Sequence, residues 1–184
     1  MEHEGEIWQE LGLNGERLRG IVPAELDVDK VNLFYGAAVM LYRYKDGEVE
    51  YLFQHRSKHL RENADTWDVS AGGHVNLNES QIDAAIRESR EEIGVNLNKE
   101  NLEIAGSYIR WKIFVTLYFY DWTNQPDNFT FNDEEVEEVK WLKASELDDF
   151  WPSLKATLRD DYIYKFNLND WAKRITTKYE NHKS

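Results

Sequence analysis

The sequence predicts an α+β or α/β fold in which a mixed β-sheet is sandwiched between helices. Its apolar segments follow the order β-β-β-α-β-β-β-α, which suits a sheet covered by helices. Asp46-Gly47 joins two apolar, aromatic runs, a strong hairpin signal because that turn requires positive φ angles. Residues 79–93 instead place apolar side chains at helical spacing, so a helix separates the two groups of strands.

The chain has 184 residues, the size of one globular domain with terminal additions. We predict an N-terminal arm over residues 1–32, a central domain over 33–150, and a C-terminal helical extension over 151–184 packed on that domain. The arm is weakly periodic, and residues 7–13 could form either a short strand or a helical turn.

Strands are predicted over 34–44, 49–55, 67–71, 102–109, 112–122 and 136–142, each rich in β-branched and aromatic residues. A short helix is expected at 144–150, and Pro152 fits the first turn of another. Asn169 is predicted to cap a final helix. That helix would turn one apolar face toward the domain, formed by Trp171, Ile175 and Tyr179.

The central helix has recognisable ends. Asn78 is a good N-cap, and Gln81, three positions on, completes a capping-box pattern. Gly94 stands where a glycine commonly ends a helix. The stripe expected to face the core consists of Ile82, Ala85, Ile86, Ser89 and Ile93.

Acidic side chains gather on one face of this helix. Glu88, Glu91 and Glu92 satisfy the i, i+3, i+4 spacing, and each like-charged pair costs a few tenths of a kcal/mol. Their position near the negative end of the helix dipole adds to that cost. A solvated Glu-rich helix is one interpretation; the other is a bound cation, and hard oxygen ligands favour Mg²⁺, Mn²⁺ or Ca²⁺. Arg87 could fold back on Glu79 and orient these acids.

The complete pattern from residue 73 to 95 resembles the signature of the Nudix hydrolase family. It comprises Gly73, Glu79, Arg87, Glu88, Glu91, Glu92, Gly94 and Val95 at the spacing of that signature. The region 33–150 also resembles the family's fold in element order. Ser89 departs from the usual bulky aliphatic residue, and its hydroxyl is expected to bond the backbone at Ala85. Asn78 replaces a common glycine, which Asn tolerates because it also accepts the left-handed conformation.

The resemblance implies a Mg²⁺-dependent pyrophosphohydrolase, with Mn²⁺ as a substitute, that cleaves a nucleoside diphosphate linked to X or a similar small organic diphosphate. It implies that Glu88, Glu91, Glu92 and the Gly72 carbonyl hold the metal. The general base stays open between Glu88 or Glu91 and the acidic loop 133–138, where Glu135 is the candidate. A merely solubilising loop is the alternative for that segment.

The flanks of the motif, residues 54–57 and 67–75, resemble the branch that includes isopentenyl-diphosphate isomerase. That isomerase needs a catalytic cysteine, and this chain has no cysteine, so isomerase activity is not expected. Arg56, Lys58 and Arg61 form a local basic cluster, either a phosphate-binding site or a solvated loop. Trp67 could stack on a substrate base or belong to the core.

The charge balance restricts the partners. With 22 basic and 35 acidic residues the net charge is −13, which disfavours nucleic acid and anionic lipid. The expected partner is a small-molecule diphosphate brought in by a cation. The lack of cysteine and of an apolar N-terminal run fits a reducing compartment without a signal peptide, and we predict a cytoplasmic location. Dimers are common in the family, so a homodimer is compatible with the resemblance.

A second function class is a non-catalytic Nudix-fold module that binds or senses a nucleotide. Such a module would normally show a broken set of acids, whereas Glu88, Glu91 and Glu92 are all present. A cation site that serves only stability is a third interpretation. Turnover of a diphosphate distinguishes the enzyme from both.

Overall fold

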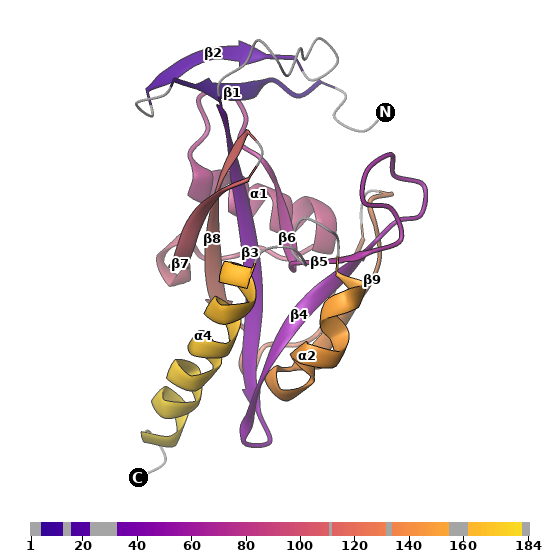
Figure 1. Cartoon of the computed structure of the whole chain (residues 1–184), viewed down its shortest axis with the longest axis vertical. Helices are drawn as coiled ribbons and strands as arrows, with labels where there is room; N and C mark the ends of the chain where they lie inside the picture. The colour runs from indigo at the N-terminus through magenta and orange to yellow at the C-terminus, as the bar shows by residue number, and fades with distance from the viewer. Residues whose placement is uncertain are drawn as a thin grey trace.

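A mixed sheet of nine strands forms the centre of the computed structural model, which describes residues 5–12, 16–22, 33–110, 112–131, 134–154 and 162–181 (Figure 1). The strands are β1 (Trp8–Leu11), β2 (Arg17–Ile21), β3 (Leu33–Lys45), β4 (Glu48–Arg56), β5 (Trp67–Asp68), β6 (Ala71–His74), β7 (Glu103–Arg110), β8 (Ile113–Asp121) and β9 (Val136–Lys143).

The long strand β3 organises this sheet. It pairs antiparallel with β1, β4 and β6, and parallel with β8. Outward from these neighbours lie β2 beside β1, β5 and β9 beside β4, and β7 beside β8. The turn between β3 and β4 has positive φ at both Asp46 (52°) and Gly47 (87°), which confirms the predicted hairpin.

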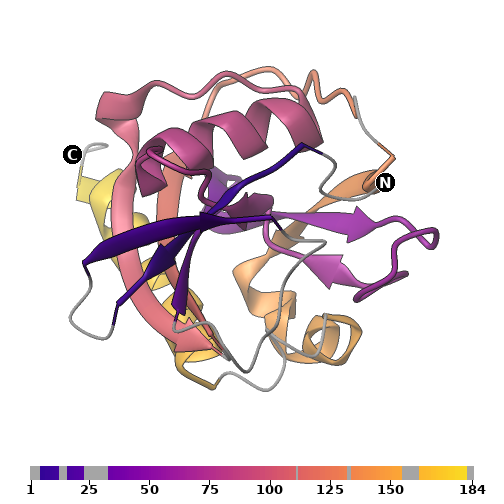
Figure 2. The ribbon, with the colours of Figure 1, turned by 90° about the horizontal axis from the view of Figure 1, so that it is seen from above.

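Helices cover both faces of the sheet (Figure 2). They are α1 (Gln81–Ile93), α2 (Leu147–Phe150) and α4 (Tyr162–Asn181), with 3-10 turns η2 (Lys99–Asn101), η3 (Ala144–Glu146) and η4 (Trp151–Ser153). Helix α1 lies on one face, and α2 and α4 lie on the other. The predicted fold class, a mixed sheet between helices, is therefore confirmed.

Alternation along β3 explains why both faces need a cover. Val39 and Leu41 are fully buried with Ala85 of α1, whereas Met40 and Tyr42 are buried with residues of α2 and α4. Side chains of a strand point alternately to opposite faces, so a continuous apolar run buries both sides of the sheet.

One predicted helix boundary is wrong. Asn169 does not cap the last helix, because α4 already begins at Tyr162 and Asn169 lies in its interior. Leu168 is fully buried, and Ile175, seven positions later, is 2% exposed. Packing of this stripe keeps the helix continuous and overrides the preference of Asn for helix ends.

The predicted apolar face of α4 is confirmed. Trp171 packs against Phe119 of β8 with ring centroids 4.8 Å apart, and Tyr179 stacks on Tyr44 of β3 at 4.9 Å. The Tyr179 hydroxyl also donates a 2.6 Å hydrogen bond to Asp121 at the end of β8. This contact anchors the C-terminal end of α4 to the sheet.

We expect Tyr179→Phe to destabilise the protein by about 1 kcal/mol at about pH 7, because it leaves the half-buried Asp121 carboxylate without this donor. Burial raises the pKa of Asp121, but hydrogen bonds from Tyr179 and Thr123 outweigh it, and the net pKa lies below its usual value. This stabilisation is thus present above the unfolded pKa and lost as pH falls through the lowered folded pKa. Urea unfolding at about pH 7 and about pH 3 should show a smaller difference between variant and wild type at the acidic pH. An equal difference at both values would contradict the role assigned to Asp121.

The three-part division of the chain stays a prediction. Strands β1 and β2 extend the sheet beyond β3, at the top of Figure 1.

None of the helices in the described segments is long and apolar enough to cross a membrane.

Candidate active site

Helix α1 carries the acidic residues, and its N-terminal cap differs from the predicted one. The cap is Ser80, whose side chain accepts a hydrogen bond from the backbone N–H of Asp83. Asn78 is instead a loop residue with φ of 66°, so only its predicted tolerance of the left-handed conformation is confirmed. Gly94 ends the helix with φ of 72°, and the Ser89 hydroxyl bonds the Ala85 carbonyl at 2.8 Å, both as predicted.

Arg87 connects the acids of this region. Its guanidinium donates hydrogen bonds to both carboxylate oxygens of Glu79, from Nε at 3.0 Å and from Nη2 at 3.1 Å. Nη1 donates to Glu88 at 2.8 Å and to Glu91 at 3.0 Å, and Nη2 also donates to the carbonyl of His74. The predicted contact with Glu79 is confirmed, and the fork geometry of arginine allows one side chain to hold all these acceptors.

Glu92 points from α1 into the sheet. It is 2% exposed, and its Oε2 accepts hydrogen bonds from the Gly72 backbone N–H at 2.8 Å and from Gln54 Nε2 at 3.3 Å. Burial raises the pKa of Glu92 well above its usual value, and the nearby charge of Glu88 raises it further. A buried carboxylate that is held by two hydrogen bonds and, within the described residues, by no close ion pair is unusual in a protein interior.

Glu88 lies against the glycine at the start of the motif. A Cβ atom placed on Gly73 would come within 2.3 Å of Glu88 Oε1, so only glycine leaves room for this carboxylate. Burial raises the pKa of Glu88 to about 7, although the neighbouring Arg87 lowers it. Glu88 and Glu92 are thus two mostly buried carboxylates on one helix face, and the charge of Glu88 opposes the ionisation of Glu92.

Two buried polar residues beside Glu92 were missed by the sequence reasoning. Gln54 of β4 stands directly opposite Asp68 of β5, and both are almost fully buried. The charge of Asp68 contributes to the raised pKa of Glu92, and that of Arg56 opposes it. The alternation of side chains along β4 could have indicated Gln54 as a site residue. Gln54 and Arg56 share the face that α1 covers, while Phe53 belongs to the opposite core.

The basic cluster lies beyond β4. The Arg56 side chain is 12% exposed, and its Nη1 is 4.0 Å from Oδ2 of Asp68, one of the acids beside Glu92. Lys58 and Arg61 are exposed in the following loop. The charge of Arg56 also acts on Glu92, and the roles of Arg56, Lys58 and Arg61 as phosphate contacts stay predictions.

Trp67 lies on the other face of the sheet. Its ring packs against His55 at 4.8 Å and Phe150 at 5.4 Å between centroids, with the core that α2 and α4 cover. It stands opposite His55 across the β4–β5 pair, so it points away from Gln54 and Glu92. Stacking of Trp67 on a substrate stays a prediction, and its observed partners are aromatic side chains of the protein.

The acidic loop runs alongside the basic cluster. The Glu135 carbonyl accepts a 2.8 Å hydrogen bond from the Ser57 N–H, and Glu137 Oε1 accepts one from Lys58 N–H at 3.2 Å. Antiparallel pairing of β9 with β4 produces this proximity. The Glu135 backbone is therefore held beside Ser57, the residue that follows Arg56, and the role of Glu135 as general base stays a prediction. Asp133 lies outside the described residues.

The N-terminal hairpin supports the loop between β6 and α1. Trp8 stacks on His74 with ring centroids 3.5 Å apart, and Gln9 and Ile7 form backbone hydrogen bonds with Val75 and Leu77. Arg17 of β2 donates to the Glu79 carbonyl at 2.8 Å. Because the Glu79 carboxylate holds Arg87, this hairpin fixes the position of the residue that connects the acids.

The acids suit a hard divalent cation by their chemistry, although they do not form a closed ligand set. Within the part of the chain that the structure describes, no group of three or more His, Asp or Glu side chains is arranged to hold an ion. Glu91 is 44% exposed and bound to Arg87, while Glu92 is bound to Gly72. The oxygen donors and the two opposed buried carboxylates nevertheless fit Mg²⁺ or Mn²⁺ better than a soft metal.

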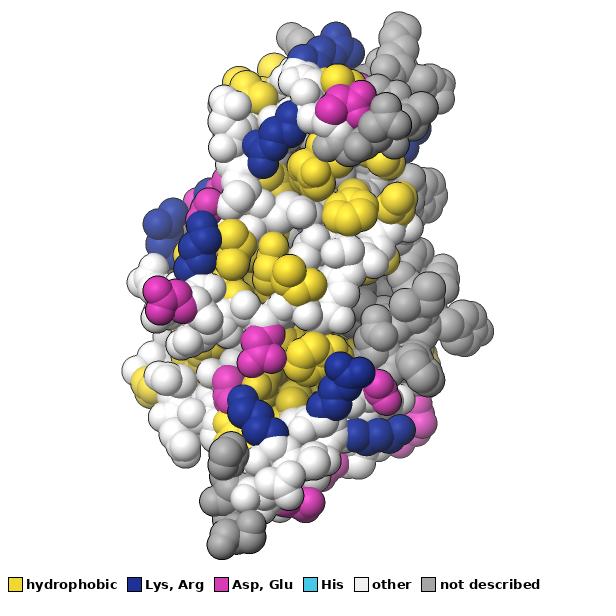
Figure 3. Space-filling view, turned by 90° about the vertical axis from the view of Figure 1, so that its left-hand side faces the viewer, with side chains coloured by type: hydrophobic (Ala, Val, Ile, Leu, Met, Phe, Trp, Pro, Cys, Tyr) yellow, Lys and Arg dark blue, Asp and Glu magenta, His cyan; other side chains and the backbone are white. Residues whose placement is uncertain are grey.

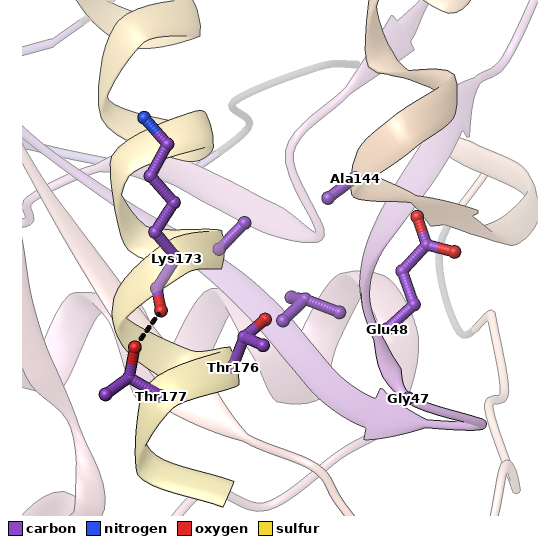
Figure 4. Close-up of a pocket in the computed structure, with 8 residues that line it drawn as sticks. Gly47, Glu48, Ala144, Lys173, Thr176 and Thr177 are labelled. Atoms are coloured by element: carbon purple, nitrogen blue, oxygen red, sulfur yellow. Dashed lines mark hydrogen bonds between the residues drawn. The ribbon is translucent and has the colours of Figure 1, made fainter. Parts of the chain in front are cut away.

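A separate cleft lies on the far side of the sheet from α1, between α4 and the β3–β4 turn (Figure 4). Its walls include Glu48, Ala144, Lys173 and Thr176, and Thr177 Oγ1 donates to the Lys173 carbonyl at 2.9 Å. None of its lining residues belongs to α1 or to the basic cluster. The cleft therefore has no part in the candidate site.

The chain and its fold have counterparts among known proteins. A family model described as the NUDIX domain matches residues 32–165, more than half of the chain. The chain belongs to the Nudix family. An uncharacterised Nudix hydrolase from Nostoc sp. strain PCC 7120 is 36% identical over 84 residues, which cover 44% of this chain and 48% of the relative. The chain thus matches about half the length of that curated relative.

Solved structures show the same Nudix fold at low identity. DR0079 from Deinococcus radiodurans has a TM-score of 0.66 at 18% identity, covering 92% of this chain and 98% of that protein. An Ap4A hydrolase from C. elegans, solved as a binary complex, has a TM-score of 0.57 at 21% identity, covering 78% and 98%. The NUDIX domain of NrtR from Shewanella oneidensis, complexed with ADP ribose, has a TM-score of 0.55 at 20% identity, covering 74% and 89%.

Proposed function

We propose that this chain is a Mg²⁺-dependent pyrophosphohydrolase that cleaves a nucleoside diphosphate linked to X, or a similar small organic diphosphate. Mn²⁺ would substitute for Mg²⁺. Membership of the Nudix family supports the reaction class, and the intact acid set on α1 supports catalysis over simple binding.

The observation that carries this proposal is the pair of mostly buried carboxylates Glu88 and Glu92. Burial raises both pKa values, and neighbouring acids raise them further, Glu91 for Glu88 and Glu88 for Glu92, so the ionised site is costly to the protein alone. A divalent cation would offset that cost and would also attract a polyanionic substrate to a chain of net charge −13.

Glu88, Glu91, Glu92 and the Gly72 carbonyl would hold the cation. When bound, the cation would neutralise the diphosphate and activate a water for attack on phosphorus. Arg87 would keep Glu88 and Glu91 oriented through the hydrogen bonds it already makes to them. Arg56, Lys58 and Arg61 would contact the phosphates that the cation leaves exposed.

The proton acceptor is proposed to be either a glutamate of the motif, Glu88 or Glu91, or Glu135 of the acidic loop. Glu135→Gln separates the two cases, because it should abolish turnover only if the loop supplies the base.

The proposal is tested with a panel of nucleoside diphosphate derivatives and other organic diphosphates in the presence of Mg²⁺ or Mn²⁺. We expect release of monophosphates or phosphate from at least one compound, detected by mass spectrometry, and loss of this release with EDTA. Failure to cleave any member of a broad panel would refute the enzyme proposal. A compound bound tightly with Mg²⁺ but recovered intact would favour the non-catalytic binding module instead.

A further inference from the structure

A fully buried glutamine, Gln54 of β4, lies beside the acids of the candidate site. Apolar side chains in contact with water are ordinary on a protein surface, and on the side shown in Figure 3 they lie among charged ones. A polar side chain removed from water is more informative, because each of its donors and acceptors needs a partner to avoid destabilising the fold.

The Gln54 amide is satisfied on one side only. Its Nε2 donates a 3.3 Å hydrogen bond to Glu92 Oε2. Its Oε1 is buried and has no hydrogen-bond partner within the part of the chain that the structure describes. This orientation of the amide fits an ionised Glu92, because turning the amide over would bring Oε1 against the carboxylate, and two such oxygens repel. Oε1 is therefore an acceptor beside Glu92 that still requires a donor.

The side chains around this oxygen are themselves acceptors. Gln54 stands directly opposite Asp68 in the β4–β5 pair, so both side chains point to the same face of the sheet. Asp68 and Glu92 are each 2% exposed, and the charge of Asp68 acts on Glu92. The oxygens of a diphosphate are also acceptors, so a phosphate cannot satisfy Gln54 Oε1. The missing partner must bring an O–H or N–H group.

A water molecule bound to a divalent cation is a donor of this kind. Its oxygen faces the cation, so both of its O–H groups, polarised by the charge, are directed away from it. Mg²⁺ is held by few protein carboxylates and usually keeps several of its waters. Glu92, the residue that Gln54 already contacts, is one of the proposed ligands. An acceptor beside that ligand is thus well placed to receive a hydrogen bond from a retained water.

We propose that Gln54 Oε1 accepts a hydrogen bond from a water molecule that the bound Mg²⁺ retains. Gln54 is then a positioning residue with two contacts, Nε2 to Glu92 and Oε1 to the water. It adds a residue of β4 to a site whose proposed metal ligands come from α1 and β6. The inference rests on the proposed cation site and hence on the proposed function.

The first experiment measures Mg²⁺ binding by isothermal titration calorimetry without any diphosphate present. Gln54→Met keeps the length of the side chain but removes both hydrogen-bonding groups. We expect the dissociation constant for Mg²⁺ to rise about tenfold or more, as is typical when a residue that orients a metal site is lost. Gln125→Met is the matched control, because Gln125 lies exposed in the loop after β8 and its replacement should leave Mg²⁺ binding unchanged. Circular dichroism checks that each variant is folded.

Ca²⁺ separates contact with a cation-bound water from general support of Glu92. Ca²⁺ accepts six to eight oxygens in a flexible arrangement, whereas Mg²⁺ gives up its waters reluctantly. Gln54→Met should therefore weaken Mg²⁺ binding more than Ca²⁺ binding, by a further factor of about three or more. Equal weakening for both cations would show that Gln54 acts only by holding Glu92, and would overturn the inference.

Gln54→Glu tests the acceptor directly and decides the matter if Gln54→Met does not fold. It keeps an acceptor oxygen at this position and loses the Nε2 donor to Glu92. We expect it to bind Mg²⁺ at least as tightly as the wild type, and binding weakened about tenfold would overturn the inference. Equal Mg²⁺ affinity of wild type and Gln54→Met would overturn this inference alone, whereas a wild type that binds no Mg²⁺ would overturn the proposed function as well.

Discussion

Glu92→Gln is expected to reduce turnover by roughly 10²-fold or more while leaving the metal-free protein at least as stable as the wild type. Gln keeps the shape of Glu92 and an oxygen that accepts from the Gly72 N–H, but it removes the negative charge offered to a cation. Loss of one group that stabilises charge at a reaction centre typically costs this much in rate.

The stability half of this expectation follows from the raised pKa of Glu92. A carboxyl group whose pKa rises on folding opposes folding at every pH above its unfolded value, and this opposition fades as pH falls through the folded value. Gln carries no charge to bury, so near neutral pH the variant avoids that penalty. The gain should be smaller when the wild type is measured with saturating Mg²⁺, which would stabilise ionised Glu92.

Two measurements on the same samples test this prediction: turnover with Mg²⁺, and thermal unfolding with and without Mg²⁺. Glu100→Gln is the matched control, because Glu100 lies exposed in η2 outside the acid set and its replacement should change neither quantity. If Glu92→Gln retained full activity, Glu92 would have no role in holding the cation. If it unfolded well below the wild type without metal, the charge would be satisfied by contacts other than those to Gly72 and Gln54.

Features of the fold that depend on local chemistry could be predicted from the sequence. Asp46-Gly47 specifies the hairpin because few residue pairs tolerate two positive φ angles, and Gly94 ends α1 for the same reason. The choice between neighbouring polar residues could not be made in this way. Asn78 and Ser80 are both good caps, and the contact of the Asn78 backbone N–H with Gln9 of the distant β1 draws that residue into the loop.

In the candidate site, too, local spacing could be predicted from the sequence, whereas contacts between distant segments could not. Helical spacing places Glu88, Glu91 and Glu92 on one side of α1, and an arginine one turn before Glu91 is expected to reach it. Burial raises the pKa of Glu92 most, the charge of Glu88 adds to it, and Asp68 raises it further. Asp68 and the Gln54 that bonds Glu92 are brought together only by the pairing of β4 with β5. The stacking of Trp8 on His74 likewise joins residues 66 positions apart, and no local pattern signals it.

Gly73→Ala is expected to reduce turnover by roughly 10²-fold with little loss of stability. The added Cβ would meet the end of the Glu88 side chain, with Oε1 at 2.3 Å and Cδ at 2.6 Å. A flexible side chain can swing away at small cost to the fold, but this motion takes the carboxylate from its hydrogen bond with Arg87. Displacement of a reacting group by about 1 Å can cost 10²-fold in rate.

Gly47→Ala should show the reverse behaviour and is the matched control. Gly47 has φ of 87° and no neighbouring atom within 4 Å of an added Cβ, so alanine meets no steric clash there but must adopt a strained backbone. We expect a loss of about 1–2 kcal/mol in unfolding free energy and unchanged turnover, because the β3–β4 turn lies far from α1 in the fold. Urea unfolding and turnover of both variants test the pair. If Gly73→Ala lost stability and activity together, the glycine would serve the fold of β6 and not the room that Glu88 requires.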